Sequence, residues 1–136
     1  MKTLNTLFLF IVATSMTISC SAQTEKNNEI AEVKKGDNVE VFYFHSTRRC
    51  VTCQAVEEVS KTTVAELYGE TVKFTGYNLD EPEAAIKAEE LEISGQTLLI
   101  VSGDTKINIT NDGFLYARNN PDKLKQIIKG NIDPLL

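Results

Sequence analysis

The sequence predicts an α/β domain in which a central mixed sheet is flanked by helices. An almost wholly apolar run of β-branched and aromatic residues at 39–44 is typical of a strand buried on both faces. Helical periodicity follows directly, and a second strand pattern comes after it. This order implies a parallel strand pair with a crossover helix. Late in the chain, two further strand patterns flank a tight turn and predict antiparallel strands.

The elements follow from local patterns along the chain. The expected strands cover residues 39–44, 71–80, 97–101 and 106–110. The expected helices run from Cys50 to about Gly69, over 83–90 with Pro82 in the first turn, and over 121–129. The run Asn111-Asp112-Gly113 indicates a turn between the last strand and the last helix.

Composition narrows the classes of function that this domain can have. The chain has 136 residues, enough for one compact domain, and its 14 Lys and Arg stand against 19 Asp and Glu. A net charge of −5 argues against the broad basic surface that a nucleic-acid partner requires. One His and three Cys also argue against a multi-metal cluster or a disulfide-dense scaffold.

Residues 1–19 are expected to be an export signal rather than part of the fold. Lys2 gives a charged start, and the apolar stretch at 7–13 is too short to span a bilayer of about 30 Å. The run from Thr17 to Cys20 resembles the lipobox of bacterial lipoproteins, which favours a lipid anchor on Cys20. Cleavage before Gln23 by an ordinary signal peptidase is the alternative.

The segment after the signal is polar and carries no core-forming side chains. Residues 20–29 therefore predict a solvated tether, and residues 30–136 form the domain. An export signal with a lipid anchor places the domain on the periplasmic side of a bacterial cell envelope, attached to a membrane. This is also a compartment in which disulfides persist.

Cys50 and Cys53 form a Cys-x-x-Cys pair at the junction of the buried strand and the first helix. Unpaired N–H groups and the helix dipole favour a thiolate at the first cysteine, and Cys53 lies one turn behind it. We therefore expect Cys50 to be the nucleophile and Cys53 the resolving thiol, with their disulfide as the redox group and no other cofactor. A soft-metal site and a structural disulfide are the alternatives.

Three neighbours of the pair are candidates for supporting roles. Arg48 and Arg49 precede the first cysteine and add positive charge that can steer an anionic substrate. His45 can hydrogen-bond or protonate a thiolate, and it is the third ligand in the alternative metal site with Cys50 and Cys53. The alternative for the two arginines is that they are only solvated in an exposed loop, and the alternative for His45 is a loop histidine at the strand end without a role.

The order of these motifs resembles that of thioredoxin-like proteins. The strand VEVFYF, the motif CVTC and the segments YNLDEPE and LEISGQTLLIV occur in the order that thioredoxins use. The resemblance implies a thioredoxin-like fold, a thiol–disulfide oxidoreductase type of activity and a redox partner protein. More narrowly, YFHSTRRCVTCQAVEE resembles an exported family of arsenic resistance, the nitrophenyl compound nitroreductase subunits, which suggests arsenical or nitroaromatic substrates.

The chain departs from ordinary thioredoxins at three places. The proline that faces the cysteines in that family is Gln96 here, followed by Thr97, so an amide side chain is available to point toward the sulfurs. Arg49 stands in place of the Trp before the motif. The buried acid of the preceding strand falls near Tyr43 or Phe44, which leaves no evident proton acceptor for Cys53.

Overall fold

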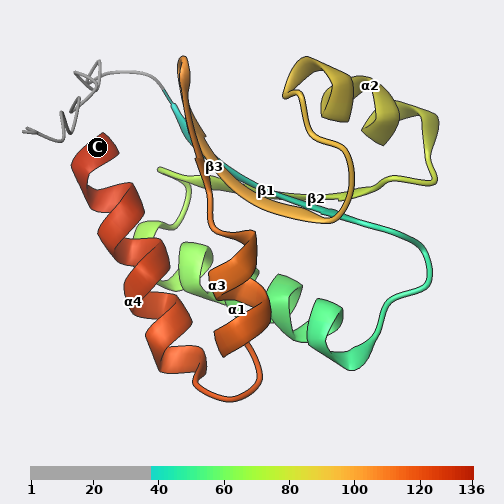
Figure 1. Cartoon of the computed structure of the whole chain (residues 1–136). Helices are drawn as coiled ribbons and strands as arrows, with labels where there is room; N and C mark the ends of the chain where they lie inside the picture. The colour runs from blue at the N-terminus through green and yellow to red at the C-terminus, as the bar shows by residue number, and fades with distance from the viewer. Residues whose placement is uncertain (1–37) are drawn as a thin grey trace, which may run out of the picture. The chain divides into compact units, whose positions relative to one another are not determined.

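The computed structural model describes residues 38–136, in which a four-stranded mixed sheet carries helices on both faces (Figure 1). The predicted export signal, the tether, the anchor at Cys20 and the start of the domain lie outside the described residues. The strands are β1 (Val39–His45), β2 (Lys73–Asn78), β3 (Thr97–Ser102) and β4 (Thr105–Asn108). The helices are α1 (Val51–Tyr68), α2 (Pro82–Glu90), α3 (Thr110–Tyr116), α4 (Pro121–Ile132) and the short 3-10 helix η1 (Asp133–Leu135). None of the helices described is both long and apolar enough to cross a membrane.

The strand order β2-β1-β3-β4 places the most apolar strand inside the sheet. β1 pairs in parallel with β2 and antiparallel with β3, and β3 pairs antiparallel with β4, as the sequence pattern predicts. Phe44, near the end of β1, lies opposite Tyr77 of β2 and Thr97 of β3. The carboxyl ends of β1 and β2 and the amino end of β3 therefore meet at one edge of the sheet.

The alternation of side chains along β1 supplies two separate apolar cores. One face of the sheet packs against α1, α3 and α4, and the opposite face packs against α2 (Figure 1). The larger core contains Val41, Tyr43, Val56, Leu98, Ile100, Leu124 and Ile128, all fully buried. The smaller core contains Phe42, Phe44, Ala88, Leu91 and Leu99. A strand that serves both cores must be apolar at nearly every position, which explains the continuous run in the sequence.

The turn predicted at Asn111-Asp112-Gly113 is wrong, because these residues lie in α3. Asn108 accepts a hydrogen bond from the Thr110 backbone N–H at 3.0 Å and ends β4, so the strand is also shorter than predicted. Gly113 is buried, and a Cβ there would lie 3.2 Å from Val56 and 3.3 Å from Leu98. The glycine thus permits close packing of α3 on α1 and β3, rather than a turn.

The remaining differences concern the ends of elements. β2 covers Lys73–Asn78, whereas residues 71–80 were expected to be strand. α4 continues to Ile132, three residues beyond the expected end, because Ile132 is fully buried and adds a turn of apolar contact. Gly69 ends α1 as predicted, with a φ of 55° that favours glycine.

Candidate active site

Cys50 lies where the loop after β1 turns into α1, at the N-cap of that helix. Its Sγ accepts a hydrogen bond from the backbone N–H of Cys53 at 3.5 Å, so the cysteine itself caps the helix. α1 is eighteen residues long, and its first turn has no acidic side chain to compete for its free N–H groups. This position favours negative charge on the Cys50 sulfur.

The two sulfurs of the pair lie 3.0 Å apart but differ in environment. Cys50 is exposed, and the hydrogen bond from the Cys53 thiol, helped by the Cys53 N–H, lowers the pKa of its thiol. Cys53 is 4% exposed, and burial together with the hydrogen bond to Cys50 raises its pKa. The exposed sulfur is therefore the better thiolate, while the buried one holds its proton.

The loop between β1 and α1 is tied to the segment after β2. The Thr47 N–H donates to Asp80 Oδ2 at 2.8 Å, and the Leu79 N–H donates to the His45 carbonyl at 2.7 Å. The hydrogen bond from the Thr47 N–H lowers the pKa of the Asp80 carboxyl. The Asn78 amide donates to Thr47 Oγ1 at 2.9 Å. The segment YNLD thus fixes the loop that presents Cys50.

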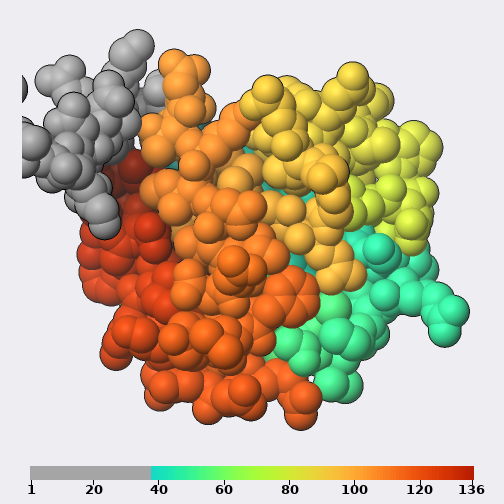
Figure 2. All heavy atoms as spheres, in the orientation of Figure 1, coloured from blue at the N-terminus to red at the C-terminus, as the bar shows by residue number. Residues whose placement is uncertain are grey.

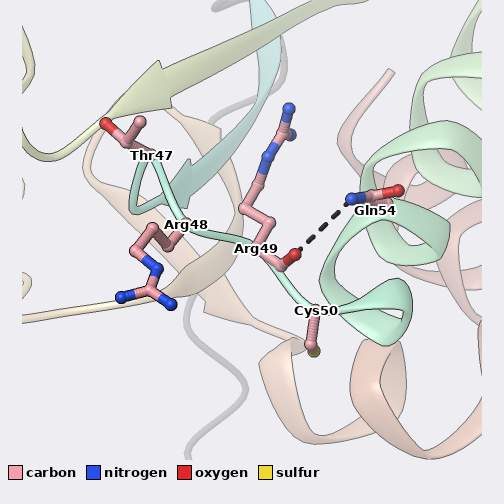
Figure 3. Close-up of a pocket in the computed structure, with 5 residues that line it drawn as sticks. All are labelled: Thr47, Arg48, Arg49, Cys50 and Gln54. Atoms are coloured by element: carbon pink, nitrogen blue, oxygen red, sulfur yellow. Dashed lines mark hydrogen bonds between the residues drawn. The ribbon is translucent and has the colours of Figure 1, made fainter.

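A polar cavity of about 580 Å³ opens beside Cys50 (Figure 3). The loop before α1, drawn in teal, lies at the molecular surface there (Figure 2). Gln54 lines the cavity, and its amide donates to the Arg49 carbonyl at 3.5 Å. The other lining residues of the cavity are Thr47, Arg48 and Arg49.

The two arginines point in different directions (Figure 3) and have different partners. Arg49 forms an ion pair with Glu57 of α1, and both side chains are about three-quarters buried. Arg48 is exposed and forms no ion pair within residues 38–136. Among the described residues that line the cavity, Arg48 is therefore the one whose positive charge has no ion-pair partner.

Gln96 and Thr97, at the start of β3, lie on the buried side of the pair. The Cys53 thiol lies 3.5 Å from the amide oxygen of Gln96, so the amide points toward the sulfurs. Thr97 is buried, and its hydroxyl donates to the Gly95 carbonyl at 3.1 Å. This hydrogen bond holds the backbone before β3.

His45 contacts its neighbours in β1 and the following loop. Its Nδ1 lies 3.1 Å from the Ser46 carbonyl, its ring packs beside that of Tyr43, and no hydrogen bond joins it to either cysteine. Across residues 38–136, no three His, Cys, Asp or Glu side chains are grouped to hold a metal ion. The alternative metal site therefore lacks its third ligand in this arrangement.

The sequence interpretation missed two residues beneath the pair. Glu57, which the sequence analysis did not single out, forms an ion pair with Arg49 and is 27% exposed. The Tyr43 hydroxyl is fully buried and has no hydrogen-bond partner. Burial raises the pKa of Tyr43, and the nearby charges of Cys53 and Glu57 raise it further. The signal available in the sequence was the four-residue spacing from Cys53 to Glu57, which places both on one face of a helix.

This architecture, with the Cys pair at the carboxyl end of a central strand, is the thioredoxin-like fold. The structure is similar to oxidised thioredoxin O2 from Arabidopsis thaliana, with a TM-score of 0.51 and 22% identity, over 70% of this chain and 76% of that one. Mitochondrial thioredoxin 3 from Saccharomyces cerevisiae is 24% identical over 71% of this chain and 81% of its own, with a TM-score of 0.45. No protein-family model and no curated protein matches the sequence.

Proposed function

We propose that the protein is a thiol–disulfide redox protein in which Cys50 is the nucleophile and Cys53 the resolving thiol. The observation that carries the proposal is the asymmetry of two sulfurs only 3.0 Å apart. One is exposed at a helix N-terminus with a lowered pKa, and the other is buried behind it with a raised pKa. The thioredoxin-like fold supports this function.

The proposed reaction transfers two electrons from the dithiol to a partner disulfide. The Cys50 thiolate attacks one sulfur of the partner, forming a mixed disulfide and releasing the other partner sulfur as a thiolate. Cys53 then loses its proton and attacks Cys50, which releases the remaining partner sulfur. The pair ends as a disulfide, and the partner ends as two thiols once protons are taken up.

The cavity beside Cys50 supports a substrate or partner with negative charge near its reactive sulfur. Arg48 is exposed there without an ion pair among the described residues, and Thr47 and Gln54 add polar groups. Positive charge at the entrance raises the encounter rate with an anion. A redox partner protein would accordingly present an acidic surface to this loop.

The narrower proposal concerns location and substrate. The resemblance of the first segment to a lipoprotein signal supports a periplasmic protein anchored through Cys20. Mass spectrometry of the mature protein should find a lipidated Cys20 at its N-terminus. A mature chain that begins with unmodified Gln23 would rule out the anchor.

Aromatic arsenical or nitroaromatic compounds are the substrates that the narrower resemblance suggests, and thiolates suit soft acceptors such as arsenic. Reduction of a pentavalent arsenical would convert the dithiol to a disulfide and release one oxygen as water. Reduced protein should then lose two thiols for each molecule reduced. If no thiols are lost on mixing, this substrate class is excluded, while disulfide exchange remains as proposed.

A redox titration with thiol counting by mass spectrometry tests the main proposal. We expect a reversible two-electron couple that disappears in Cys50→Ser. A bound metal that survives purification and blocks alkylation of both cysteines would instead favour the soft-metal site. A pair that neither titrates nor alkylates in the folded protein would leave a structural role.

A further inference from the structure

The two arginines before Cys50 are adjacent in the chain, but their charges are placed differently. Both residues line the cavity beside Cys50, and Figure 3 shows their side chains pointing in different directions. Arg49 is paired with Glu57 of α1, and 28% of its side chain is exposed. Arg48 is exposed and has no ion-pair partner within residues 38–136. The cavity therefore has one unpaired arginine charge where the sequence supplies two.

Gly76 of β2 leaves room for the carboxylate that pairs with Arg49. The Oε2 atom of Glu57 pairs with the guanidinium, and its Oε1 atom lies against Gly76, where a Cβ would be only 2.9 Å away. A side chain at position 76 would therefore push the carboxylate aside. The contact is with the far end of a flexible side chain, so β2 itself would not have to move. Because the φ of Gly76 is not positive, the reason for glycine here is this space rather than a turn.

Partial burial makes the pairing of Arg49 with Glu57 stronger than that of a typical surface ion pair. Ion pairs between fully exposed side chains contribute little, but these two side chains are about three-quarters buried. Leaving one of the two charges unpaired in such a place costs free energy. Without the carboxylate, the guanidinium gains hydration by turning toward the polar cavity that Arg49 also lines.

We propose that the Glu57 carboxylate sets the charge preference of the reaction at Cys50 by holding Arg49 away from the cavity. Gly76 contributes the space in which the carboxylate lies. A disulfide that approaches the Cys50 sulfur then meets a single unpaired cation, Arg48, and the protein selects disulfides that carry one anionic group near the sulfur. Glu57 and Gly76 act through Arg49, so they are positioning residues rather than catalytic ones. The proposal rests on the redox function proposed above.

Three small disulfides that differ in charge test this proposal on the reduced full chain. The probes are dithiobis(nitrobenzoate), which is anionic, cystamine, which is cationic, and bis(2-hydroxyethyl) disulfide, which is neutral. The rate at which Cys50 reacts is measured by quenching with an alkylating agent and by peptide mass spectrometry. Each rate with a charged probe is divided by the rate with the neutral probe. The ratio of the two normalised rates, anionic over cationic, is the charge preference.

Glu57→Gln should raise the charge preference by about ten-fold at low salt, because it releases Arg49 into the cavity. This change consists of a rise of about three-fold with the anionic probe and a similar fall with the cationic one. Added salt should reduce both effects. A purely structural role of Glu57 would change the rates with all three probes in the same direction, which leaves the normalised rates as they are.

Three further variants separate the position of Arg49 from the net charge of the site. Gly76→Ala keeps every charge but displaces the Glu57 carboxylate, so it should raise the charge preference by about two- to four-fold. Glu57→Gln combined with Arg49→Gln removes both members of the pair and should return the charge preference to within about two-fold of the wild type. Glu58→Gln removes a carboxylate from the adjacent exposed residue, where the charge is screened, and should change the preference by less than about two-fold.

The outcomes distinguish failure of this proposal from failure of the redox function. If Cys50 of the wild-type protein reacts with none of the three disulfides, the redox function itself is wrong. If it reacts but the charge preference is unchanged in Glu57→Gln or in Gly76→Ala, only the role of Glu57 and Gly76 is wrong. An equal rise in Glu57→Gln and Glu58→Gln would show that net charge alone matters, and would overturn the proposal as well.

Discussion

The exposed and the buried halves of the site differ in almost every property, although their sulfurs are 3.0 Å apart. Cys50 faces solvent, the polar cavity lined by Arg48 and the free N–H groups of α1. Cys53, one turn further on, faces β1 and Gln96 and is nearly inaccessible. Because the same residue type occupies both positions, the difference in chemistry comes from their environments alone. A helix that begins at the edge of a sheet supplies both environments within a single turn.

The largest expected effect comes from removing each sulfur in turn. Cys50→Ser should lower the rate of reaction with a disulfide by at least about 100-fold, because the remaining thiol is buried and keeps its proton. Cys53→Ser should still react but should accumulate the mixed disulfide on Cys50. Intact-protein mass spectrometry measures both products. Equal adduct formation in the two variants would remove the distinction between attacking and resolving thiols.

Alkylation as a function of pH measures the same asymmetry without a mutation. Because the pKa of Cys50 is lowered, its thiolate persists at lower pH, and its rate should fall only as the pH falls through that lowered value. The raised pKa of Cys53 delays its alkylation until the pH exceeds the usual thiol value of about 8.5. At pH 7 we expect Cys50 to label at least about ten-fold faster than Cys53. The two alkylation rates should converge in denaturant. Equal rates in the folded protein would contradict the expected difference in pKa between Cys50 and Cys53.

Reversing the charge of Arg48 should change only the rate at which the exposed Cys50 reacts with charged disulfides. With an anionic disulfide such as dithiobis(nitrobenzoate), Arg48→Glu should react about five- to ten-fold more slowly at low salt, and added salt should narrow the gap. With cystamine, a cationic disulfide, the variant should instead react faster than the wild type. Arg118→Glu is the matched control, since Arg118 is exposed but does not line the cavity. An equal loss in both variants would point to net charge rather than to the cavity.

A smaller effect, on the reduction potential of the pair, is expected from replacing Gln96 beside the buried Cys53. Its amide oxygen accepts from the Cys53 thiol, an interaction available only to the reduced protein. Gln96→Leu should therefore destabilise the dithiol by about 1 kcal/mol and make the reduction potential about 20 mV more negative. Gln54→Leu, which removes an amide bonded to the Arg49 carbonyl, should leave the potential unchanged. A shift toward positive potential in Gln96→Leu would show that this contact favours the disulfide.

Local sequence patterns predicted most of the fold because most helices and strands are encoded by residues close together in the chain. The apolar run of β1, the periodicity of α1 and its stop at Gly69 each follow from short stretches of chain. Helix α3 was not predicted because its sequence, with Asn111, Asp112 and Gly113 together, has the composition of a turn. Its helix depends on Gly113 fitting between Val56 and Leu98, which are distant in sequence.

The candidate site, too, was predicted from the sequence only in part. The position of Cys50 and Cys53 at a strand–helix junction was evident from the sequence, as was the amide at Gln96. The separate partners of Arg48 and Arg49 were not, because adjacent loop residues carry no sign of where their side chains point. Glu57 was not singled out, because helical periodicity alone ranks a carboxylate as polar, and its ion-pair partner Arg49 lies in a loop eight residues earlier.

The sequence by itself determined the α/β class, the order of most elements and the placement of a Cys-x-x-Cys pair at the start of a helix. These properties depend on residues close together in the chain, so periodicity and spacing reveal them. Only the tertiary structure decided which sulfur is buried and what lies beneath it. The approach of the Glu57 carboxylate to Gly76 requires α1 and β2 to pack together, and no local pattern encodes a contact between residues nineteen positions apart.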